Sequence, residues 1–181
     1  MLVGNTVDEF EVEGKEVKIR YPEMKDLDDL LEYINSLIEE GGYLLFQEKK
    51  TREEEIGWLS DVLENNESGE KIYLVVEVKG EVMGGASVEC GVGAKSHVGK
   101  FGIGLKKDVR EMGIGTRLAE AIFNEAEERL GIEIIKMEVF ESNKRAISFY
   151  KSLGFEERGR IRDGAYVQGS YEDTVIMQKD L

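Results

Sequence analysis

The chain has 181 residues and a net charge of −14, which fits one domain that buries roughly 70% of its unfolded surface. The charge argues against nucleic acid and anionic membranes as partners, because proteins bind both mainly through lysine and arginine. One cysteine excludes an internal disulfide, and with a single histidine it cannot form a Cys/His metal cluster. The acidic N-terminus and the short apolar runs resemble neither a signal peptide nor a membrane span, so we expect a cytoplasmic protein without a metal.

The first part of the chain is predicted to contain an acidic extension over residues 1–16, then one strand and two helices. Alternation at Val17–Tyr21 favours the strand. Apolar residues at helical spacing predict a helix over 24–38, closed by Gly41–Gly42. A second helix should begin behind Thr51, whose hydroxyl can cap a first turn rich in glutamate.

The central part reads as an antiparallel meander of the strands IYLVVEV, EVMGGASVEC and VGKFGIGL. A helix over 114–130 follows, stopped by Gly131, and then the strand IEIIKMEVF. Because a helix joins the strands at 101–106 and 133–140, we expect these two strands to be parallel within a mixed sheet.

The C-terminal part is predicted to hold one short helix and two strands. Asn143 or Ser142 caps the helix, which runs through Tyr150 and ends at Gly154. The strands are expected near 155–160 and 171–177. No repeat or linker interrupts residues 17–181, which should form a single domain.

The stretch REMGIGTRL at 110–118 places Gly113 and Gly115 where a strand turns into a helix. The first N–H groups of a helix lack partners and carry partial positive charge, and glycine lets a phosphate approach them. A diphosphate would fit there. Two glycines can also simply permit a tight turn, so this motif alone leaves both interpretations open.

A second motif accompanies the first: Asn143, Ala146, Phe149–Tyr150 and Leu153-Gly154-Phe155. Together, R-x-x-G-x-G behind a strand and this second motif resemble the GNAT superfamily of acetyl-CoA-dependent N-acetyltransferases, over about residues 17–179. The resemblance implies an α+β (mixed α/β) fold. It implies a central, mostly antiparallel sheet of six to seven strands, flanked by about four helices and splayed at strands 4 and 5, which here are the strands at 101–106 and 133–140.

The resemblance also implies a set of cofactor-binding residues, with acetyl-CoA as cosubstrate. Main-chain amides of the turn would hold the coenzyme A pyrophosphate, Leu105 would pair with pantetheine as if with another strand, and Asn143 would contact the pantetheine arm. The residues of the turn are Arg110, Glu111, Met112, Gly113, Ile114, Gly115 and Thr116. Many family members carry basic or small polar residues where this chain has Glu111 and Met112, and we expect Glu111 to face solvent.

Acyl transfer to an amine needs a proton acceptor, a group that polarises the carbonyl, and a donor for the departing thiolate. Glu138 is the first choice as base, with Glu141 in reserve. Glu138 stands twelve residues before Tyr150, and in similar members of the family the same spacing separates a strand glutamate from the helix tyrosine. By resemblance, Tyr150 is the general acid and the Leu105 N–H polarises the thioester. The competing structural interpretations are a salt-bridged strand residue for Glu138 and an aromatic packing beside Phe149 for Tyr150.

Three further groups of residues are candidates for catalysis or for binding of the acceptor. Cys90 with His97 as its base is a weak nucleophile candidate, since nothing nearby suggests a depressed thiol pKa. The tail could offer an aromatic and acidic wall to an amine, or an edge hairpin whose acids face water: Tyr166, Tyr171, Glu172 and Asp173. Aromatic residues near the second helix could line a pocket or pack in the core: Trp58, Tyr43 and Phe46.

The sequence therefore predicts an N-acetyltransferase that acts on a primary amine of a small molecule. The run HVGKFGIGLKKDVREMGIG resembles the GNAT branch that acetylates free amino acids, polyamines and similar amines. A protein N-terminal or lysine acetyltransferase and a non-catalytic acyl-CoA-binding protein remain as alternatives. A homodimer also remains open, because dimers are frequent among similar enzymes.

Overall fold

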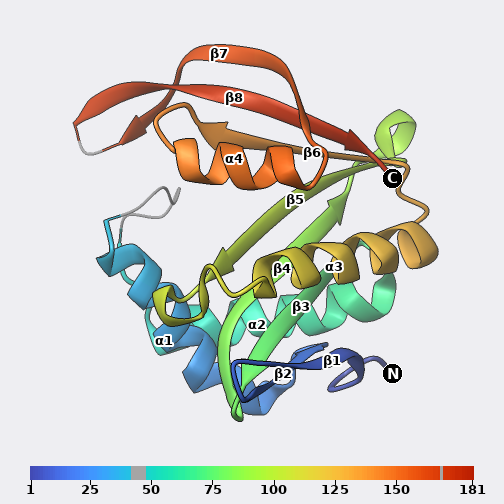
Figure 1. Ribbon diagram of the computed structural model, residues 1–181. Helices are drawn as coiled ribbons and strands as arrows, with labels where there is room; N and C mark the ends of the chain where they lie inside the picture. Colours follow the sequence, from blue (N-terminus) through green and yellow to red (C-terminus); the bar gives the residue numbers. More distant parts are fainter. Residues whose placement is uncertain (42–47, 168) are drawn as a thin grey trace.

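The computed structural model describes residues 1–41, 48–167 and 169–181. Its strands form one mixed sheet of eight in the order β1-β2-β3-β4-β5-β6-β8-β7 (Figure 1). The strands are β1 Thr6–Val12, β2 Lys15–Arg20, β3 Lys71–Val78, β4 Glu81–Cys90, β5 Val98–Leu105, β6 Ile134–Phe140, β7 Glu156–Val167 and β8 Ser170–Asp180. Neighbours in this order are antiparallel except β5 and β6, which are parallel as predicted.

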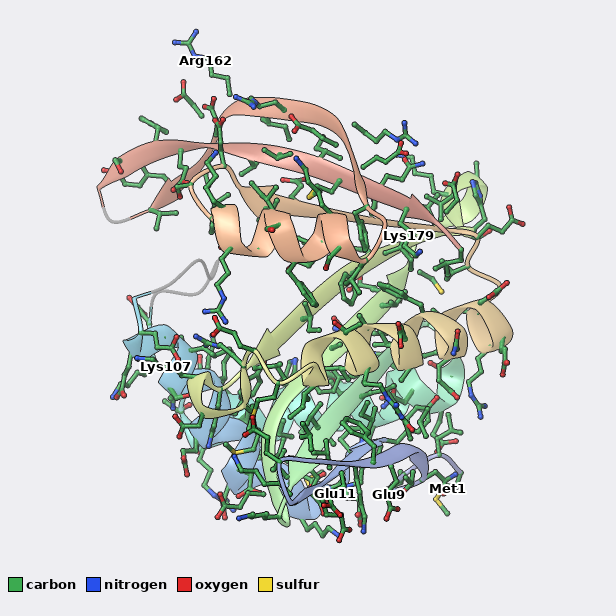
Figure 2. The ribbon with its side chains drawn as sticks, viewed as in Figure 1. Met1, Glu9, Glu11, Lys107, Arg162 and Lys179 are labelled. Atoms are coloured by element: carbon green, nitrogen blue, oxygen red, sulfur yellow. The ribbon has the colours of Figure 1, made fainter. Side chains whose placement is uncertain are left out.

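The sheet has one strand more than the six to seven expected, because β1 lies within residues 1–16, where no strand was predicted. It pairs antiparallel with β2 through a turn at Glu13-Gly14, both with positive φ. Phe10 and Val12 pack against the core, while Glu9 and Glu11 point away from the sheet (Figure 2). The alternation of EFEVE is typical of a half-buried strand, but the many acidic residues of this segment led to the prediction of an extension without a strand.

The described residues form four α-helices beside the sheet, the number expected: α1 Leu27–Glu39, α2 Arg52–Ser68, α3 Ile114–Leu130 and α4 Lys144–Ser152. Single 3₁₀ turns lie at Met24–Asp26, Gly93–Lys95 and Lys107–Val109. The caps follow the predicted chemistry, since Thr51 and Glu54 form a capping box on α2, and the Asn143 side chain accepts from the Ala146 N–H at 3.1 Å. The predicted helix-closing residue Gly42 lies outside the described part of the chain.

The helices lie on two faces of the sheet, as alternate residues of β3 show. Ile72 and Leu74 belong to a core with α3, whereas Tyr73 and Val75 belong to a second core with α1 and α2. Helix α4 lies on the α3 face, because Tyr150 joins the aromatic cluster of that core. Two layers of helices therefore enclose the sheet, and α1 and α2 share the face opposite α3 and α4.

The parallel pair opens where β5 and β6 diverge. Their pairing extends from Val98↔Ile134 to Lys100↔Lys136, although β5 continues to Leu105 and β6 to Phe140. Figure 1 shows the two strands separating, with α4 beside the opening. This is the predicted splay between the strands at 101–106 and 133–140, and it leaves one edge of β5 without a strand neighbour.

Candidate active site

The turn into α3 presents unpaired main-chain donors. Gly113 is the N-cap residue with φ +77°, and the first bond of the helix runs from the Arg117 N–H to the Gly113 carbonyl at 3.2 Å. Within the described residues, no acceptor bonds the N–H groups of Gly113, Ile114, Gly115 and Thr116. A Cβ on Gly113 would meet no protein atom within 4 Å, so the space before these amides is open. The turn fits an anionic group such as a diphosphate.

Arg110 and Glu111 differ in their availability for such a group. The Arg110 N–H donates to the Lys107 carbonyl at 3.3 Å, and its guanidinium donates to the Leu105 carbonyl and to Glu40. Arg110 is thus already bound on both sides and holds the turn against β5 and α1. The Glu111 side chain is 82% exposed and lies 3.8 Å from the Arg145 guanidinium, which confirms that it faces solvent.

The free edge of β5 offers a second set of main-chain groups. Lys106 donates to the Met83 carbonyl at 2.8 Å, and Gly84↔Leu105 is the last register pair with β4. Because main-chain groups of alternate residues face opposite edges, the N–H groups of Ile103 and Leu105 face the splay. Pairing with β6 has ended by Lys100, so the described strands provide no partner for these two donors. An extended ligand could complete the edge.

Gly115 joins the three elements around the splay. A Cβ at this position would lie 3.4 Å from Leu105 and 3.5 Å from Phe149. The N-terminus of α3, the end of β5 and the middle of α4 are therefore in contact. The two sequence motifs meet at this point, which is the arrangement that their resemblance implied.

Tyr150 lies in α4 among aromatic rings, with centroids 6.3 Å from Phe101, 5.8 Å from Phe155 and 5.5 Å from Phe149. It is 7% exposed, and burial raises its pKa to about 12. No described residue hydrogen-bonds its hydroxyl. The ring thus packs as the structural interpretation expected, yet its phenol remains neutral and available as a donor.

Glu138 lies on the other face of the sheet from Tyr150. Met137 and Val139 belong to the core that contains Tyr150, so Glu138 between them points toward the α1 and α2 face. Its carboxylate is exposed and accepts from the Thr174 hydroxyl at 3.5 Å. The structure does not pair it with Lys136 or Lys106; the latter bonds Glu32 at 2.7 Å. The proposed base and acid flank the splay from opposite faces.

Glu141, the reserve base, is engaged by Arg160 at 2.7 Å. The tail residues gather nearby, around an open hollow of about 420 Å³ that Glu172 and Asp173 help to line. Glu172 accepts from the Ser142 N–H at 3.0 Å, and Asp173 accepts from the Asp163 N–H at 2.9 Å. The acids of the predicted wall are thus hydrogen-bonded within the protein.

The aromatic residues proposed for the acceptor region have different surroundings. Tyr166 and Tyr171 are 61% and 70% exposed, with ring centroids 5.0 Å apart. Trp58 packs edge-on against Tyr73 at 5.1 Å, within the core of α1 and α2. Tyr43 and Phe46 lie outside the described residues.

The Cys90–His97 pair gains no support as a nucleophile and base. Burial and the neighbouring acids Glu70 and Glu89 raise the pKa of the Cys90 thiol, which favours the unreactive protonated form. His97 is exposed in the hairpin before β5. Neither residue lies at the splay.

Glu55 was predicted only as part of the glutamate-rich first turn of α2, with no role of its own. In the structure Glu55 is 5% exposed, on the same helix face as Leu59 and Val62, whereas Ile56 is half-exposed. The i, i+4, i+7 spacing of these three residues could have identified it.

The described residues contain no group of three or more His, Cys, Asp or Glu side chains that could hold a metal ion. No helix in the same residues is long and apolar enough to cross a bilayer.

The geometry between the two diverging parallel strands fits a phosphate-bearing, extended ligand. A model of the acetyltransferase (GNAT) family matches residues 31–155. The L-amino acid N-acetyltransferase AaaT of Escherichia coli (strain K12) is 29% identical over 107 residues, which cover 59% of this chain and 66% of that protein.

Solved structures of acetyltransferases have a similar fold. The ribosomal-protein-alanine N-acetyltransferase of Brucella melitensis is 27% identical with a TM-score of 0.80, over 90% of this chain and 99% of that one. The phosphinothricin acetyltransferase of Sinorhizobium meliloti, solved with acetyl-CoA, is 21% identical with a TM-score of 0.79, over 91% of this chain and 88% of that one. The chain belongs to the GNAT family of acetyltransferases.

Proposed function

We propose that the protein transfers the acetyl group of acetyl-CoA to a primary amine of a small molecule, such as an amino acid or a polyamine. The observation that carries the proposal is the row of unbonded amides from Gly113 to Thr116, directly beside the free edge of β5. A helix N-terminus binds the diphosphate, and a strand edge binds an extended pantetheine arm. Acetyl-CoA contains both.

The main chain holds and polarises the cosubstrate. When bound, acetyl-CoA supplies a thioester that an amine attacks directly. The amides of residues 111–116 bind the pyrophosphate, and Asn143 contacts the pantetheine arm with the amide group that its capping bond to Ala146 leaves free. The Leu105 N–H, which faces the splay, polarises the carbonyl. Arg110 acts indirectly, since its bonds to Leu105 and Glu40 fix the turn.

Glu138 and Tyr150 divide the proton transfers between the two faces. Glu138 accepts the amine proton, directly or through water, on the α1 and α2 face. Tyr150 donates a hydrogen bond to the departing sulfur on the α4 face. With its pKa at about 12, the phenol is protonated at neutral pH, so this donor is always present. A thiol has a pKa of about 8.5 in water, well below that of the Tyr150 phenol. Full proton transfer from the phenol to the thiolate is therefore unfavourable unless burial raises the pKa of the thiol as well.

Two relatives suggest two acceptor classes. AaaT acts on L-amino acids, which favours a small molecule, and a free amine matches the acidic character of the chain. The Brucella melitensis neighbour is a ribosomal-protein-alanine N-acetyltransferase, which makes a protein N-terminus the second candidate. The small amine leads because aromatic side chains and the largely buried acid Glu55 lie on the α1 and α2 face, where Glu138 points.

Thiol release from acetyl-CoA tests the proposal with a panel of polyamines, amino acids and peptides that carry an N-terminal alanine. We expect turnover with small amines and at least about 10-fold lower kcat/KM with peptides. Preference for the peptides would replace the first candidate with the second. Acetyl-CoA binding without turnover on any acceptor would indicate a non-catalytic acyl-CoA-binding protein.

A further inference from the structure

Glu55 carries a carboxyl group that no described residue pairs with. It lies in the first turn of α2, and the residue is 5% exposed. Neither a hydrogen bond nor an ion pair joins its side chain to any residue that the structure describes. Burial raises its pKa, although Lys50 acts in the opposite direction. No fully buried side-chain oxygen among the described residues lacks a hydrogen-bond partner, so the unpaired Glu55 carboxylate keeps contact with solvent and is open to a ligand.

Aromatic side chains surround this carboxyl group. Tyr33 and Tyr73 are almost fully buried in the same core, and Trp58 lies edge-on against Tyr73. Glu55 shares the α2 face of Leu59 and Val62, which belong to the same core. Burial raises the pKa of both tyrosines, and the charge of Glu55 acts in the same direction on each. Aromatic faces with one carboxylate are the environment that an alkylammonium prefers.

The tyrosine hydroxyls lie over two glycines of the sheet. A Cβ on Gly104 would come within 2.4 Å of the Tyr33 hydroxyl, and one on Gly85 within 2.4 Å of the Tyr73 hydroxyl. Gly85 and Gly104 are cross-strand partners, and Gly104 immediately precedes Leu105. The tyrosines of the core that Glu55 borders therefore lie against the end of β5 that faces the splay, on the sheet face toward which Glu138 points.

Basic side chains near this group are already paired with carboxylates. The pairs are Lys50 with Glu54, Lys106 with Glu32, and Arg110 with Glu40. The carboxylate of an amino-acid acceptor would have to compete with these glutamates. A second ammonium, in contrast, would meet an unpaired acid.

Resting on the proposed acetyl transfer, we propose that Glu55 binds the distal ammonium of a diamine or polyamine while the other amine is acetylated. Glu138 takes one proton from the ammonium, and the neutral nitrogen then forms the N–C bond as the C–S bond of the thioester breaks. The nitrogen releases its second proton as the amide forms, which balances the proton that the thiolate takes up on the Tyr150 side. The distal ammonium stays charged throughout, and its contact with Glu55 makes this acid a specificity residue rather than a catalytic one.

Matched substrates and matched variants test this assignment. Steady-state kinetics compare 1,4-diaminobutane with 1-aminobutane and an L-amino acid, in the wild type, in Glu55→Gln and in Glu53→Gln. Glu53 is exposed in the same helix turn, so its substitution removes one charge without touching the buried group. Circular dichroism confirms that each variant is folded.

We expect the wild type to have a KM for 1,4-diaminobutane at least about 10-fold below that for 1-aminobutane. Glu55→Gln should abolish this preference by raising the diamine KM, with kcat, the acetyl-CoA KM and the monoamine kinetics within about twofold of wild type. Glu53→Gln should behave as wild type. An unchanged diamine KM in Glu55→Gln, or a wild-type preference for the amino acid, would overturn the assignment while acetyl transfer stands.

Calorimetric titration with 1,4-diaminobutane separates this assignment from the proposed function. Absence of thiol release with every amine would refute acetyl transfer to small amines. Binding of the diamine to the wild type and its loss in Glu55→Gln would still support the ammonium site. Equal binding to both proteins, or no binding to the wild type, would refute it.

Discussion

Tyr150 combines tight packing with a hydroxyl that no described residue engages. Substitution by phenylalanine keeps the ring contacts with Phe101, Phe149 and Phe155 and removes only the donor. We expect Tyr150→Phe to lower kcat by about 10²-fold or more, with nearly unchanged acetyl-CoA affinity and thermal stability. Assays of thiol release measure kcat, calorimetric titration measures the acetyl-CoA affinity, and thermal unfolding measures the stability. Full turnover in this variant would remove Tyr150 from the mechanism and leave the packing interpretation.

Glu138 and Glu141 form a natural pair for comparison, because one carboxylate is open and the other is bound to Arg160. Glu138→Gln should lower kcat by about 10²-fold and weaken the dependence of kcat on the ionisation of a base. Glu141→Gln should change kcat less than about threefold, since Arg160 already occupies the carboxylate of Glu141. The pH profiles of both variants decide between them, and the reverse ranking would make Glu141 the base.

Individual residues could be predicted from sequence where local chemistry decides. Thr51 and Asn143 cap their helices as expected, because a cap needs only a side-chain acceptor and the next turn. Glu111 faces solvent as expected. The burial of Glu55 agrees with its i, i+4, i+7 spacing to Leu59 and Val62, although its place in a run of three glutamates obscures that pattern.

The N-terminus of α3 carries the cofactor assignment, and α3 supplies its own control. Gly113 and Gly131 flank this helix with φ of +77° and +64°, and a Cβ at either position would meet no atom within 4 Å. Valine at either site should cost similar stability, about 1–3 kcal/mol, from the unfavourable φ. Only Gly113→Val should also weaken acetyl-CoA binding, by at least about 10-fold, because its side chain covers the amides. Thermal unfolding and calorimetry compare the two.

The outcome that contradicts this assignment is equally specific. If Gly113→Val folds and binds acetyl-CoA as tightly as Gly131→Val, the amides of this turn do not hold the pyrophosphate. If both variants lose affinity equally, the loss reflects strain in α3 rather than a blocked site.

Helices and strands with a strong hydrophobic periodicity, or with a glycine at their ends, were predicted well. The crossover from β5 through α3 to β6 follows from a strand, a 17-residue helix and a second strand, and the parallel pair is confirmed. The register that ends at Lys100 could not be predicted, because divergence of two strands depends on what packs between them. Strand β1 was not predicted, because its alternating apolar residues Phe10 and Val12 lie between glutamates in a strongly acidic segment.

For the whole molecule, Glu55 predicts a stability that depends on pH. Burial raises the pKa of Glu55 in the folded state. At pH values just above the ordinary range of a glutamate, the unfolded chain therefore binds fewer protons at this group than the folded chain does. The folded state is therefore penalised progressively as pH rises through that interval. Glu55→Gln should unfold at a higher temperature than wild type at pH 7.5 and at the same temperature near pH 4. A lower melting temperature at pH 7.5 would mean that the carboxylate is stabilised by a partner.

The fold as a whole could be inferred because two distant motifs, REMGIG and N-x-x-A-x-x-F-Y, require one arrangement of β5, α3 and α4. Contact of Gly115 with Leu105 and Phe149 confirms that arrangement. The acceptor side that we propose was much harder to predict. The residues proposed for it lie in α1, α2, β3 and β6, and no short spacing links them before the chain folds.

The central claim is that this chain binds acetyl-CoA through the N-terminus of α3 and the edge of β5. Calorimetric titration of the purified, folded wild-type protein with acetyl-CoA tests it most directly. We predict saturable binding at one site per chain. Absence of binding by material that is folded by circular dichroism would contradict the assignment of the site and the acetyl transfer derived from it.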